Sequence, residues 1–265
     1  MPGILAAPPV DDPAGTLLAL DFDGTLAHIV DDPTQAFAHP DAVLALGRLG
    51  RVLGTVAIIT GRPVTQALEL GGFASVDGLD GLIIFGQYGA ERWDAASGEA
   101  IGSERVETID RLAERLPEIL AQHGAETALI EDKGLALAVH TRGLAEDLID
   151  RLRVPLASVA SDMGLMLEPG KQVLEMRFAG ADKGHALRAL VAETSARTVV
   201  FGGDDLGDIP AFEAVDDLRA GGMRGLLVCS ASTEQDALVS RADVVLDGPD
   251  AVAIWLAAWA EALGT

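Results

Sequence analysis

The sequence has 265 residues, enough for one large domain or two modest ones. Its 41 acidic residues outnumber 19 basic ones, and a formal net charge of −22 disfavours nucleic acid and anionic membranes as partners. It contains no apolar run long enough to cross a bilayer. We therefore expect a globular protein that binds neither nucleic acid nor a membrane.

The beginning of the chain and its cysteine content bear on its location. Residues 1–15 are rich in Pro, Gly and Ala, and without a basic start they predict a flexible tail rather than a signal peptide. The single Cys229 excludes an intramolecular disulfide and fits a reducing compartment. Because it follows the apolar run 226–228, we interpret it as a core residue rather than a nucleophile. We expect a cytoplasmic protein, with a monomer as the simplest state.

The first predicted strand, residues 17–20, ends abruptly in Asp21-Phe22-Asp23-Gly24-Thr25-Leu26. Its unbroken apolar run is typical of a strand buried on both faces of a parallel sheet. Asp21 and Asp23, two residues apart, should share one side of the chain beyond the strand's carboxyl end, where open α/β sheets bind ligands. Neighbouring carboxylates repel unless a cation neutralises them, and Mg²⁺ is the natural candidate. The alternative is a polar turn without a function.

Two further segments follow the same pattern of strand and strand-end motif. The apolar spacing predicts a helix over 40–53, and a second buried strand over 55–59 ends in Thr60-Gly61-Arg62-Pro63. The Thr60 hydroxyl and nearby backbone N–H groups could hold phosphate, or the segment could simply begin a helix. A third strand, 82–85, runs into Gly86-Gln87-Tyr88-Gly89, which indicates either a turn near a site or a plain hairpin.

The pattern of elements then changes. We predict a helix over 103–123, strands over 128–131 and 135–141, a helix over 144–156, and strands over 164–167 and 173–178. Helix, two strands, helix, two strands is typical of a small antiparallel sheet with both helices on one face. We therefore interpret residues 88–179 as an inserted domain, and residues 16–87 with 180–265 as the main domain.

The first pattern resumes after the insertion. A helix over 186–194 follows Asp182-Lys183-Gly184, and a strand over 199–201 ends in Gly202-Gly203-Asp204-Asp205-Leu206-Gly207-Asp208. Strands over 226–228 and 244–246 and a helix over 250–263 complete the domain. Acids after a buried strand could complete a Mg²⁺ site with Asp21, and Lys183 could offset the charge of a phosphate. Alone, this acidic motif would be a solvated turn.

Together these motifs resemble those of the haloacid-dehalogenase-like phosphatases. The resemblance implies an α/β fold, with a Rossmann-like core around a parallel sheet and an inserted α+β cap domain. It implies that Asp21 is the nucleophile that becomes an aspartyl-phosphate and that Asp23 is the general acid and base. The implied catalytic residues are Asp21, Asp23, Thr60 and Lys183, and the implied Mg²⁺ ligands are Asp21, Asp23, Asp204 and Asp208.

The inserted domain narrows the resemblance. Glu131-Asp132-Lys133-Gly134, His140-Thr141-Arg142 and Gly170-Lys171-x-x-x-Glu175-x-Arg177 look like motifs of the trehalose-6-phosphate phosphatases. This similarity implies a sugar-phosphate substrate, whose sugar contacts Glu131, Lys133 and Glu175. The expected substrate-binding residues are Thr60, Gly61, Arg62, Glu131, Lys133, Arg142 and Glu175. Without the resemblance, residues 131–134 would favour a solvated hairpin turn.

The sequence departs from the family pattern at three places. The fourth motif, Gly203-Asp204-Asp205-Leu206-Gly207-Asp208-Ile209, lacks the usual Thr and final Glu. Thr60 replaces a commoner Ser, and Thr141 stands where Tyr is frequent. The resemblance predicts a Mg²⁺-dependent phosphatase that hydrolyses trehalose 6-phosphate in trehalose biosynthesis. The alternatives are a phosphatase for another sugar phosphate, such as sucrose phosphate or a glycosyl-phosphoglycerate, and a non-catalytic regulator that binds a sugar phosphate.

Overall fold

The chain forms two units in the computed structural model, which describes residues 11–102, 107–145, 147–170, 172–178, 182–231 and 238–265. The larger unit combines Met1–Ile101 with Asp182–Thr265, and the smaller unit is Gly102–Ala181. No helix in the described ranges is long and apolar enough to cross a membrane.

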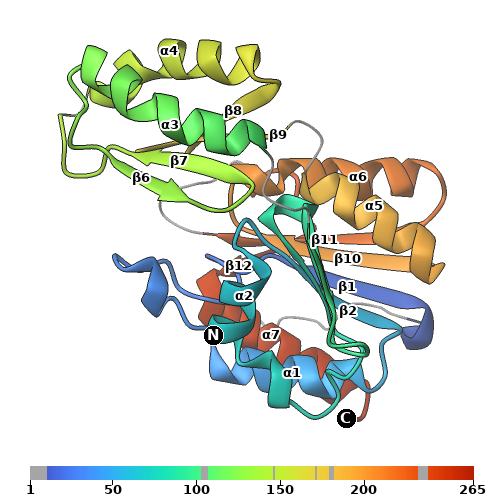
Figure 1. The fold of residues 1–265 in the computed structure, drawn as a ribbon. Helices are drawn as coiled ribbons and strands as arrows, with labels where there is room; N and C mark the ends of the chain where they lie inside the picture. The colour runs from blue at the N-terminus through green and yellow to red at the C-terminus, as the bar shows by residue number, and fades with distance from the viewer. Residues whose placement is uncertain (1–10, 103–106, 146, 171, 179–181, 232–237) are drawn as a thin grey trace. The chain divides into compact units, whose positions relative to one another are not determined.

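An eight-stranded sheet forms the centre of the larger unit (Figure 1). Its strands are β1 (Thr16–Leu20), β2 (Thr55–Ile59), β3 (Ile83–Gly86), β4 (Glu91–Asp94), β5 (Ala100–Gly102), β10 (Thr198–Gly203), β11 (Arg224–Ala231) and β12 (Val244–Asp247). Their order is β12-β11-β10-β1-β2-β3-β4-β5. Strands from β12 to β3 pair in parallel, whereas β4 returns antiparallel to β3. The predicted parallel α/β sheet is confirmed.

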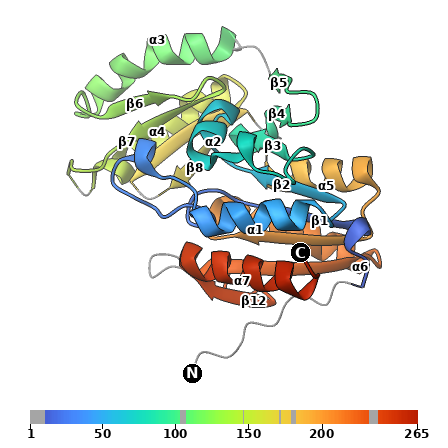
Figure 2. The ribbon, with the colours of Figure 1, turned by 90° about the horizontal axis from the view of Figure 1, so that it is seen from below.

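Helices cover both faces of this sheet, which explains the unbroken apolar run of β1. Its residues Leu18 and Leu20 pack with α1 (Pro40–Gly50), α2 (Val64–Gly71) and α7 (Gly248–Ala262). Leu17 and Ala19 pack on the other face with α5 (Lys183–Thr194) and α6 (Ile209–Ala220). Figure 2 shows α1 and α7 side by side on the face of the sheet that is turned to the viewer. All five residues of β1 are buried, as a strand between two helix layers requires.

Among the strands and α-helices of the larger unit, β4, β5 and α6 were not predicted. Helix α6 follows the fourth motif directly, with Pro210 in its first turn and Ala211, Phe212 and Val215 buried. A proline at the start and apolar residues at helical spacing were the local signal for it. The predictions for α7 and Cys229 are confirmed, since Trp255, Trp259 and Cys229 are all buried.

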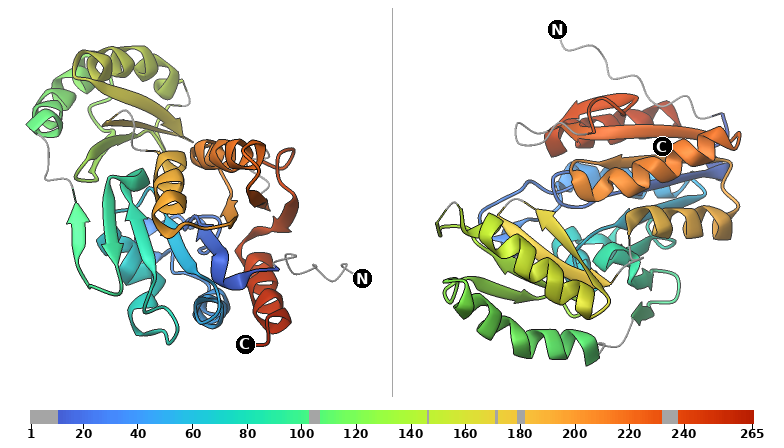
Figure 3. Two further views of the ribbon diagram at one scale, coloured as in Figure 1. Left: turned by 90° about the vertical axis from the view of Figure 1, so that its right-hand side faces the viewer. Right: turned by 90° about the horizontal axis from the view of Figure 1, so that it is seen from above.

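The smaller unit is a four-stranded antiparallel sheet with two helices. Its strands are β6 (Leu129–Asp132), β7 (Ala136–His140), β8 (Leu165–Gly170) and β9 (Val173–Phe178), in the order β6-β7-β9-β8. Helices α3 (Glu107–Gln122) and α4 (Leu148–Asp162) cover one face (Figures 1 and 3). Leu137, Val139, Leu174 and Met176 face these helices and form the core. The predicted arrangement of both helices on one face is confirmed.

Helix α4 and strand β8 of the smaller unit differ most from prediction. Helix α4 starts later and continues past Pro155 to Asp162, because Leu156 and Val159 beyond the proline are buried in the core. This burial outweighs the hydrogen bond that a helical proline removes. Strand β8 extends to Gly170, beyond the predicted end at residue 167, because β9 pairs with it to the end.

The division between the units also differs from the predicted domain limits. It falls between residues 101 and 102, later than the predicted limit at 88, because β4 continues the large sheet. Within the predicted tail, Pro13–Gly15 form a short 3₁₀ turn, and Arg197 Nε donates to Asp12 Oδ2 at 2.6 Å. Residues 1–10 and the predicted limit at 179–180 lie outside the described residues.

Candidate active site

Three neighbouring parallel strands end at one edge of the large sheet. Leu20 of β1 lies opposite Gly202 of β10 and Ile58 of β2, so the three carboxyl ends are close to level. The residues that follow them, Asp21, Thr60 and Asp204, are all buried. Tertiary structure thus brings together the three motifs that the sequence places after separate strands.

Asp21, Asp204 and Asp208 form a buried carboxylate cluster, with one oxygen from each lying within 4.8 Å of the others. The carboxylate of Asp23, also predicted as a metal ligand, lies outside this group. The turn after β1 allows the close approach of Asp204, because Gly24 has φ +75° and a Cβ there would lie 2.0 Å from Asp204 Oδ2. Only glycine fits this position without displacing the carboxylate.

Lys183, the first residue of α5, binds two of the three carboxylates of this cluster. Its Nζ donates to Asp21 Oδ1 at 2.5 Å and to Asp208 Oδ1 at 2.7 Å. Burial disfavours the ammonium, but the charges of Asp208 and Asp21 outweigh it and raise the pKa of Lys183 well above its ordinary value. Lys183 is therefore a charged donor in the centre of the site.

Asp208 also supports the turn that carries the other acids. Its Oδ2 accepts the backbone N–H of Asp204 at 2.9 Å and that of Asp205 at 3.2 Å. The Asp205 carboxylate in turn accepts the N–H of Gly207 at 2.9 Å, which completes a capping box. Both oxygens of Asp208 therefore already accept protein donors, and this residue holds Asp204 and Lys183 in place.

Burial and mutual repulsion shift the titration of the cluster. Burial raises the pKa of Asp21 well above its ordinary value, although Lys183 acts in the opposite direction. Burial, followed by the charge of Asp21, raises the pKa of Asp204 to about 10. A divalent cation would favour the ionised form of both carboxylates, and their hard oxygens are the donors that Mg²⁺ prefers. The residues present therefore fit a Mg²⁺ site.

Asp23 has a different partner. Arg62 donates to its two oxygens through Nε at 2.7 Å and Nη2 at 2.6 Å, a charge-assisted pair. The N–H of Arg62 also donates to Thr60 Oγ1 at 3.1 Å. Arg62 was predicted to contact substrate, and in this structure its guanidinium binds the predicted general acid.

The residues predicted to bind sugar lie in the smaller unit, on the sheet face opposite α3 and α4. Glu131 and Glu175 flank Ala138 across the strands. Lys133 Nζ donates to Glu175 Oε2 at 2.6 Å, and His140 Nε2 lies 2.8 Å from Glu131 Oε2. Glu175 is buried, whereas Arg142 is exposed beyond β7, and Lys171 lies outside the described residues.

Sequence reasoning did not single out Glu91 or Ser230. Glu91 Oε2 accepts the N–H of Val64 at 2.7 Å at the start of α2, next to the loop that carries Thr60. Ser230 Oγ donates to the carbonyl of Gly24 at 2.6 Å and supports the turn after β1. Neither residue belongs to a local motif, so the sequence offered no signal for either contact.

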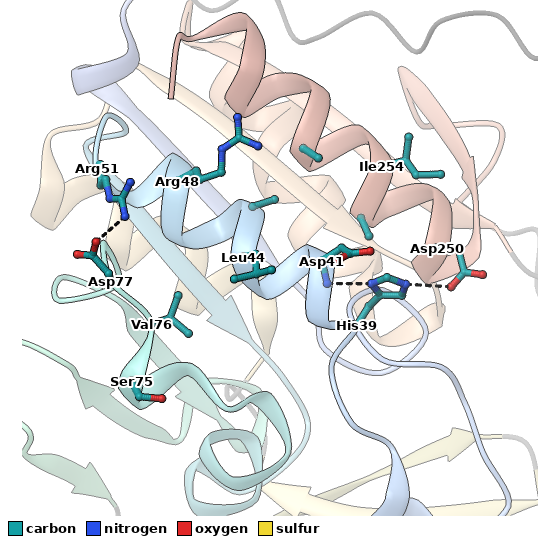
Figure 4. A pocket seen from close by; sticks show the side chains of 13 residues that line it. His39, Asp41, Leu44, Arg48, Arg51, Ser75, Val76, Asp77, Asp250 and Ile254 are labelled. Carbon is teal, nitrogen blue, oxygen red and sulfur yellow. Dashed lines mark hydrogen bonds and ion pairs between the residues drawn. The ribbon is translucent and has the colours of Figure 1, made fainter.

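A wide groove of about 860 Å³ lies elsewhere on the larger unit, along α1 and α7 (Figure 4). Leu44, Val76 and Ile254 are among the residues that line it, and His39 Nε2 lies 3.5 Å from Asp250 Oδ1 (Figure 4). None of the predicted site residues lines this groove. The candidate active site is therefore the strand-end cluster and not this groove.

The contact between Gly24 and Asp204 predicts that Gly24→Ala destabilises the protein more than Gly222→Ala. Both glycines have positive φ, so alanine at either should cost about 1–2 kcal/mol of backbone strain. Only at Gly24 would the methyl also meet a carboxylate, and such overpacking costs typically about 1–3 kcal/mol more. Urea unfolding should show the difference, and equal midpoints for the two variants would contradict it.

The raised pKa of Asp204 predicts a pH dependence in metal-free protein. The unfolded chain loses this proton near its ordinary value of 3.8, whereas the folded state keeps it to about 10. The free energy of unfolding therefore falls as pH rises between these values, by about 1.4 kcal/mol per pH unit for one proton. In excess chelator, Asp204→Asn should lose stability less steeply than wild type between roughly pH 6 and 8.

The same pair of proteins tests the metal site. Mg²⁺ at 100-fold above its Kd should stabilise the wild type by about 2.7 kcal/mol and leave Asp204→Asn nearly unchanged. Asp41→Asn, which removes an exposed carboxylate from α1, is the control and should respond like the wild type. Equal pH slopes, or equal stabilisation of all three proteins by Mg²⁺, would refute the assignment of Asp204.

Several curated proteins have sequences similar to that of this chain. The chain is 34% identical over 210 residues to the trehalose-6-phosphate phosphatase of Escherichia coli, covering 77% of this chain and 74% of that protein. It is 35% identical over 209 residues to an uncharacterised glycosyl hydrolase of Mycobacterium tuberculosis, covering 74% of this chain. This match spans only 15% of the M. tuberculosis protein. A trehalose-phosphate phosphatase of Mycolicibacterium paratuberculosis is 28% identical, and that match covers 86% of this chain and 58% of that protein.

Solved structures share the fold. The C-terminal domain of the trehalose-6-phosphate phosphatase of C. albicans superposes with a TM-score of 0.73 at 20% identity, covering 97% of this chain and 99% of that one. A trehalose-6-phosphate phosphatase related protein gives 0.70 at 23% identity, covering 94% and 98%. A haloacid dehalogenase-like hydrolase of Bacteroides thetaiotaomicron gives 0.63 at 16% identity, covering 91% and 98%.

These similarities confirm the predicted haloacid-dehalogenase-like fold. A family model described as trehalose-phosphatase matches residues 19–245, a range that includes the three strand-end motifs, Lys183 and the whole smaller unit. The family match extends over most of this chain and includes the residues of the strand-end cluster. The chain therefore belongs to the trehalose-phosphatase family.

Proposed function

We propose that the protein is a Mg²⁺-dependent phosphatase that hydrolyses trehalose 6-phosphate to trehalose and phosphate. The observation that carries the proposal is the buried pair of Lys183 and Asp21 beside Asp204, in a chain of this family. A buried ammonium against a strand-end carboxylate costs desolvation energy that a purely structural site would not require. Phosphoryl transfer needs such positioned charges.

Asp21 is the nucleophile in this mechanism. Lys183 binds its Oδ1, so we assign the attack on phosphorus to Oδ2. The bond from phosphorus to the sugar oxygen breaks as the bond to Asp21 forms, which leaves an aspartyl-phosphate. The Lys183 ammonium would offset the negative charge of the phosphoryl oxygens, and the Thr60 hydroxyl would bind one of them. Both side chains are buried at the same edge of the sheet.

Asp23 transfers the protons. It donates one to the departing sugar oxygen, then accepts one from the water that attacks phosphorus and releases Asp21. In this structure both its oxygens accept from Arg62, so the carboxyl group must leave this pair before it can donate to the sugar oxygen. We therefore assign the pair with Arg62 to the enzyme before substrate binds, and Arg62 becomes available to the phosphate when Asp23 takes up its proton.

Mg²⁺, when bound, would be held by Asp21 and Asp204 and would neutralise negative charge on the phosphate. Asp208, named as a ligand from the sequence, would act mainly by holding Lys183 and the turn of Asp204. We place the reaction in trehalose biosynthesis. We place the protein in the cytoplasm, a reducing compartment that suits the free thiol of Cys229.

The smaller unit, proposed as the cap, would select the sugar. Glu175 is buried, and within the described part of the chain its Oε1 has no hydrogen-bond partner. An unpaired buried acceptor is costly, and a sugar hydroxyl would satisfy it. Glu131 and Lys133 lie on the same sheet face and are more accessible, so they suit reversible contacts with hydroxyl groups.

The nucleophile is tested by Asp21→Asn, which keeps the shape of the side chain and removes its charge. Turnover of trehalose 6-phosphate should fall at least about 10³-fold, while substrate still binds. The matched control is Asp41→Asn, whose turnover should equal that of the wild type. Substantial turnover by Asp21→Asn would exclude the covalent mechanism, and inactivity of the wild type on all sugar phosphates would favour a non-catalytic binder.

The sugar contacts are tested by Glu131→Gln, with Glu118→Gln on α3 as the control. Loss of one charged contact should lower kcat/KM for trehalose 6-phosphate by roughly 10-fold, the scale of a hydrogen bond to a charged group. Hydrolysis of p-nitrophenyl phosphate, which has no sugar, should be unchanged. Equal losses for both substrates would instead assign Glu131 to folding or to a general role in activity.

A further inference from the structure

The turn that follows β3 has a strained backbone. Gln87 and Tyr88 are consecutive and adopt left-handed conformations, with φ of 47° and 59°. This conformation is costly for any residue with a side chain, and it persists only where the surroundings impose it. Such strain tends to collect at functional sites, so the contacts that hold this turn are informative.

Those contacts tie the turn to the predicted phosphate-binding loop. The N–H of Gln87 donates to the carbonyl of Arg62 and the N–H of Tyr88 to that of Thr60, both at 2.9 Å. The Gln87 side chain donates to Glu91 Oε1 at 2.6 Å, and Glu91 also binds the first turn of α2. The turn and the loop that carries Thr60 therefore form one hydrogen-bonded structure.

This arrangement places the ring of Tyr88 against the site. A Cβ on Gly61 would lie 2.7 Å from Tyr88 Cζ and 2.8 Å from its hydroxyl oxygen. A Cβ on Gly207, in the turn after Asp204 and Asp205, would lie 3.6 Å from Tyr88 Cε1. The ring thus lies between two strand-end turns, and its hydroxyl end is at the loop of Thr60.

The chemistry of a phenol suits this position. Carboxylates dominate the edge of the sheet, and they repel a phosphate unless it is offset by donors and cations. A tyrosine hydroxyl donates a hydrogen bond without adding negative charge, and its ring excludes water on one side. Gly61 leaves the space that the ring needs, whereas a side chain at Gly207 would only touch the ring.

We propose that Tyr88 is a further substrate-contacting residue, whose hydroxyl donates to a phosphoryl oxygen of the bound phosphate monoester while its ring forms the wall beside Gly61. This inference rests on the proposed phosphatase function, because Thr60 is assigned to the same phosphoryl group. It extends the site to a residue of the larger unit that comes from a fourth strand end, that of β3.

The test is calorimetric binding of inorganic phosphate to the Mg²⁺-loaded full chain. Tyr88→Phe keeps the ring and removes only the hydroxyl, so the Kd for phosphate should rise roughly 10-fold, as for loss of a hydrogen bond to a charged group. The melting temperature should not change. Ser97→Ala, which removes a hydroxyl from the exposed turn between β4 and β5, is the control and should bind phosphate like the wild type.

A parallel assay with p-nitrophenyl phosphate separates binding from turnover. Tyr88→Phe should raise KM and the inhibition constant of phosphate by the same factor as the Kd. A Kd within twofold of the wild type would overturn the role of Tyr88, even if trehalose 6-phosphate is hydrolysed. A 10-fold weaker Kd in a chain without turnover would support Tyr88 and reject the proposed enzyme instead, while a wild type that binds no phosphate would reject both.

Discussion

The buried ammonium of Lys183 is the interaction on which the site depends. It lies against Asp21 and Asp208, and Asp204 completes a group of three buried acids around one buried base. One positive charge cannot neutralise three carboxylates, so burial and repulsion raise the pKa values of Asp21 and Asp204. The protein therefore carries an excess of acceptors where a dianionic phosphate and a divalent cation could meet.

Such a group of like charges persists because rigid backbone imposes it. Adjacent parallel strands buried on both faces bring their carboxyl ends to one edge, and the helix layers leave them no freedom to separate. The capping box of Asp205 and Asp208 then holds the acidic turn in place, and Gly24, which has no side chain, lets the Asp204 carboxylate lie against the turn after β1. The free energy of folding the sheet thus offsets the repulsion within the cluster.

The two units supply different chemistry. The larger unit concentrates charge at buried strand ends, which suits the binding of phosphate and the positioning of a nucleophile. The smaller unit presents a polar sheet face with paired acids and bases, among them Lys133 with Glu175 and Arg177 with Glu168. Acids and bases paired in this way suit the hydroxyl groups of a sugar better than a phosphate.

The sequence by itself determined which segments form the six parallel strands and which residues end them, because these follow from local apolar runs and short motifs. It also indicated the fold of the inserted unit. Tertiary structure decided the partners: Lys183 meets Asp21 across 162 positions, and Arg62 meets Asp23 across 39. Helix α4 continues past Pro155, and Tyr88 reaches Gly61, for the same reason. Long-range packing, which no short motif records, selects among local conformations of similar energy.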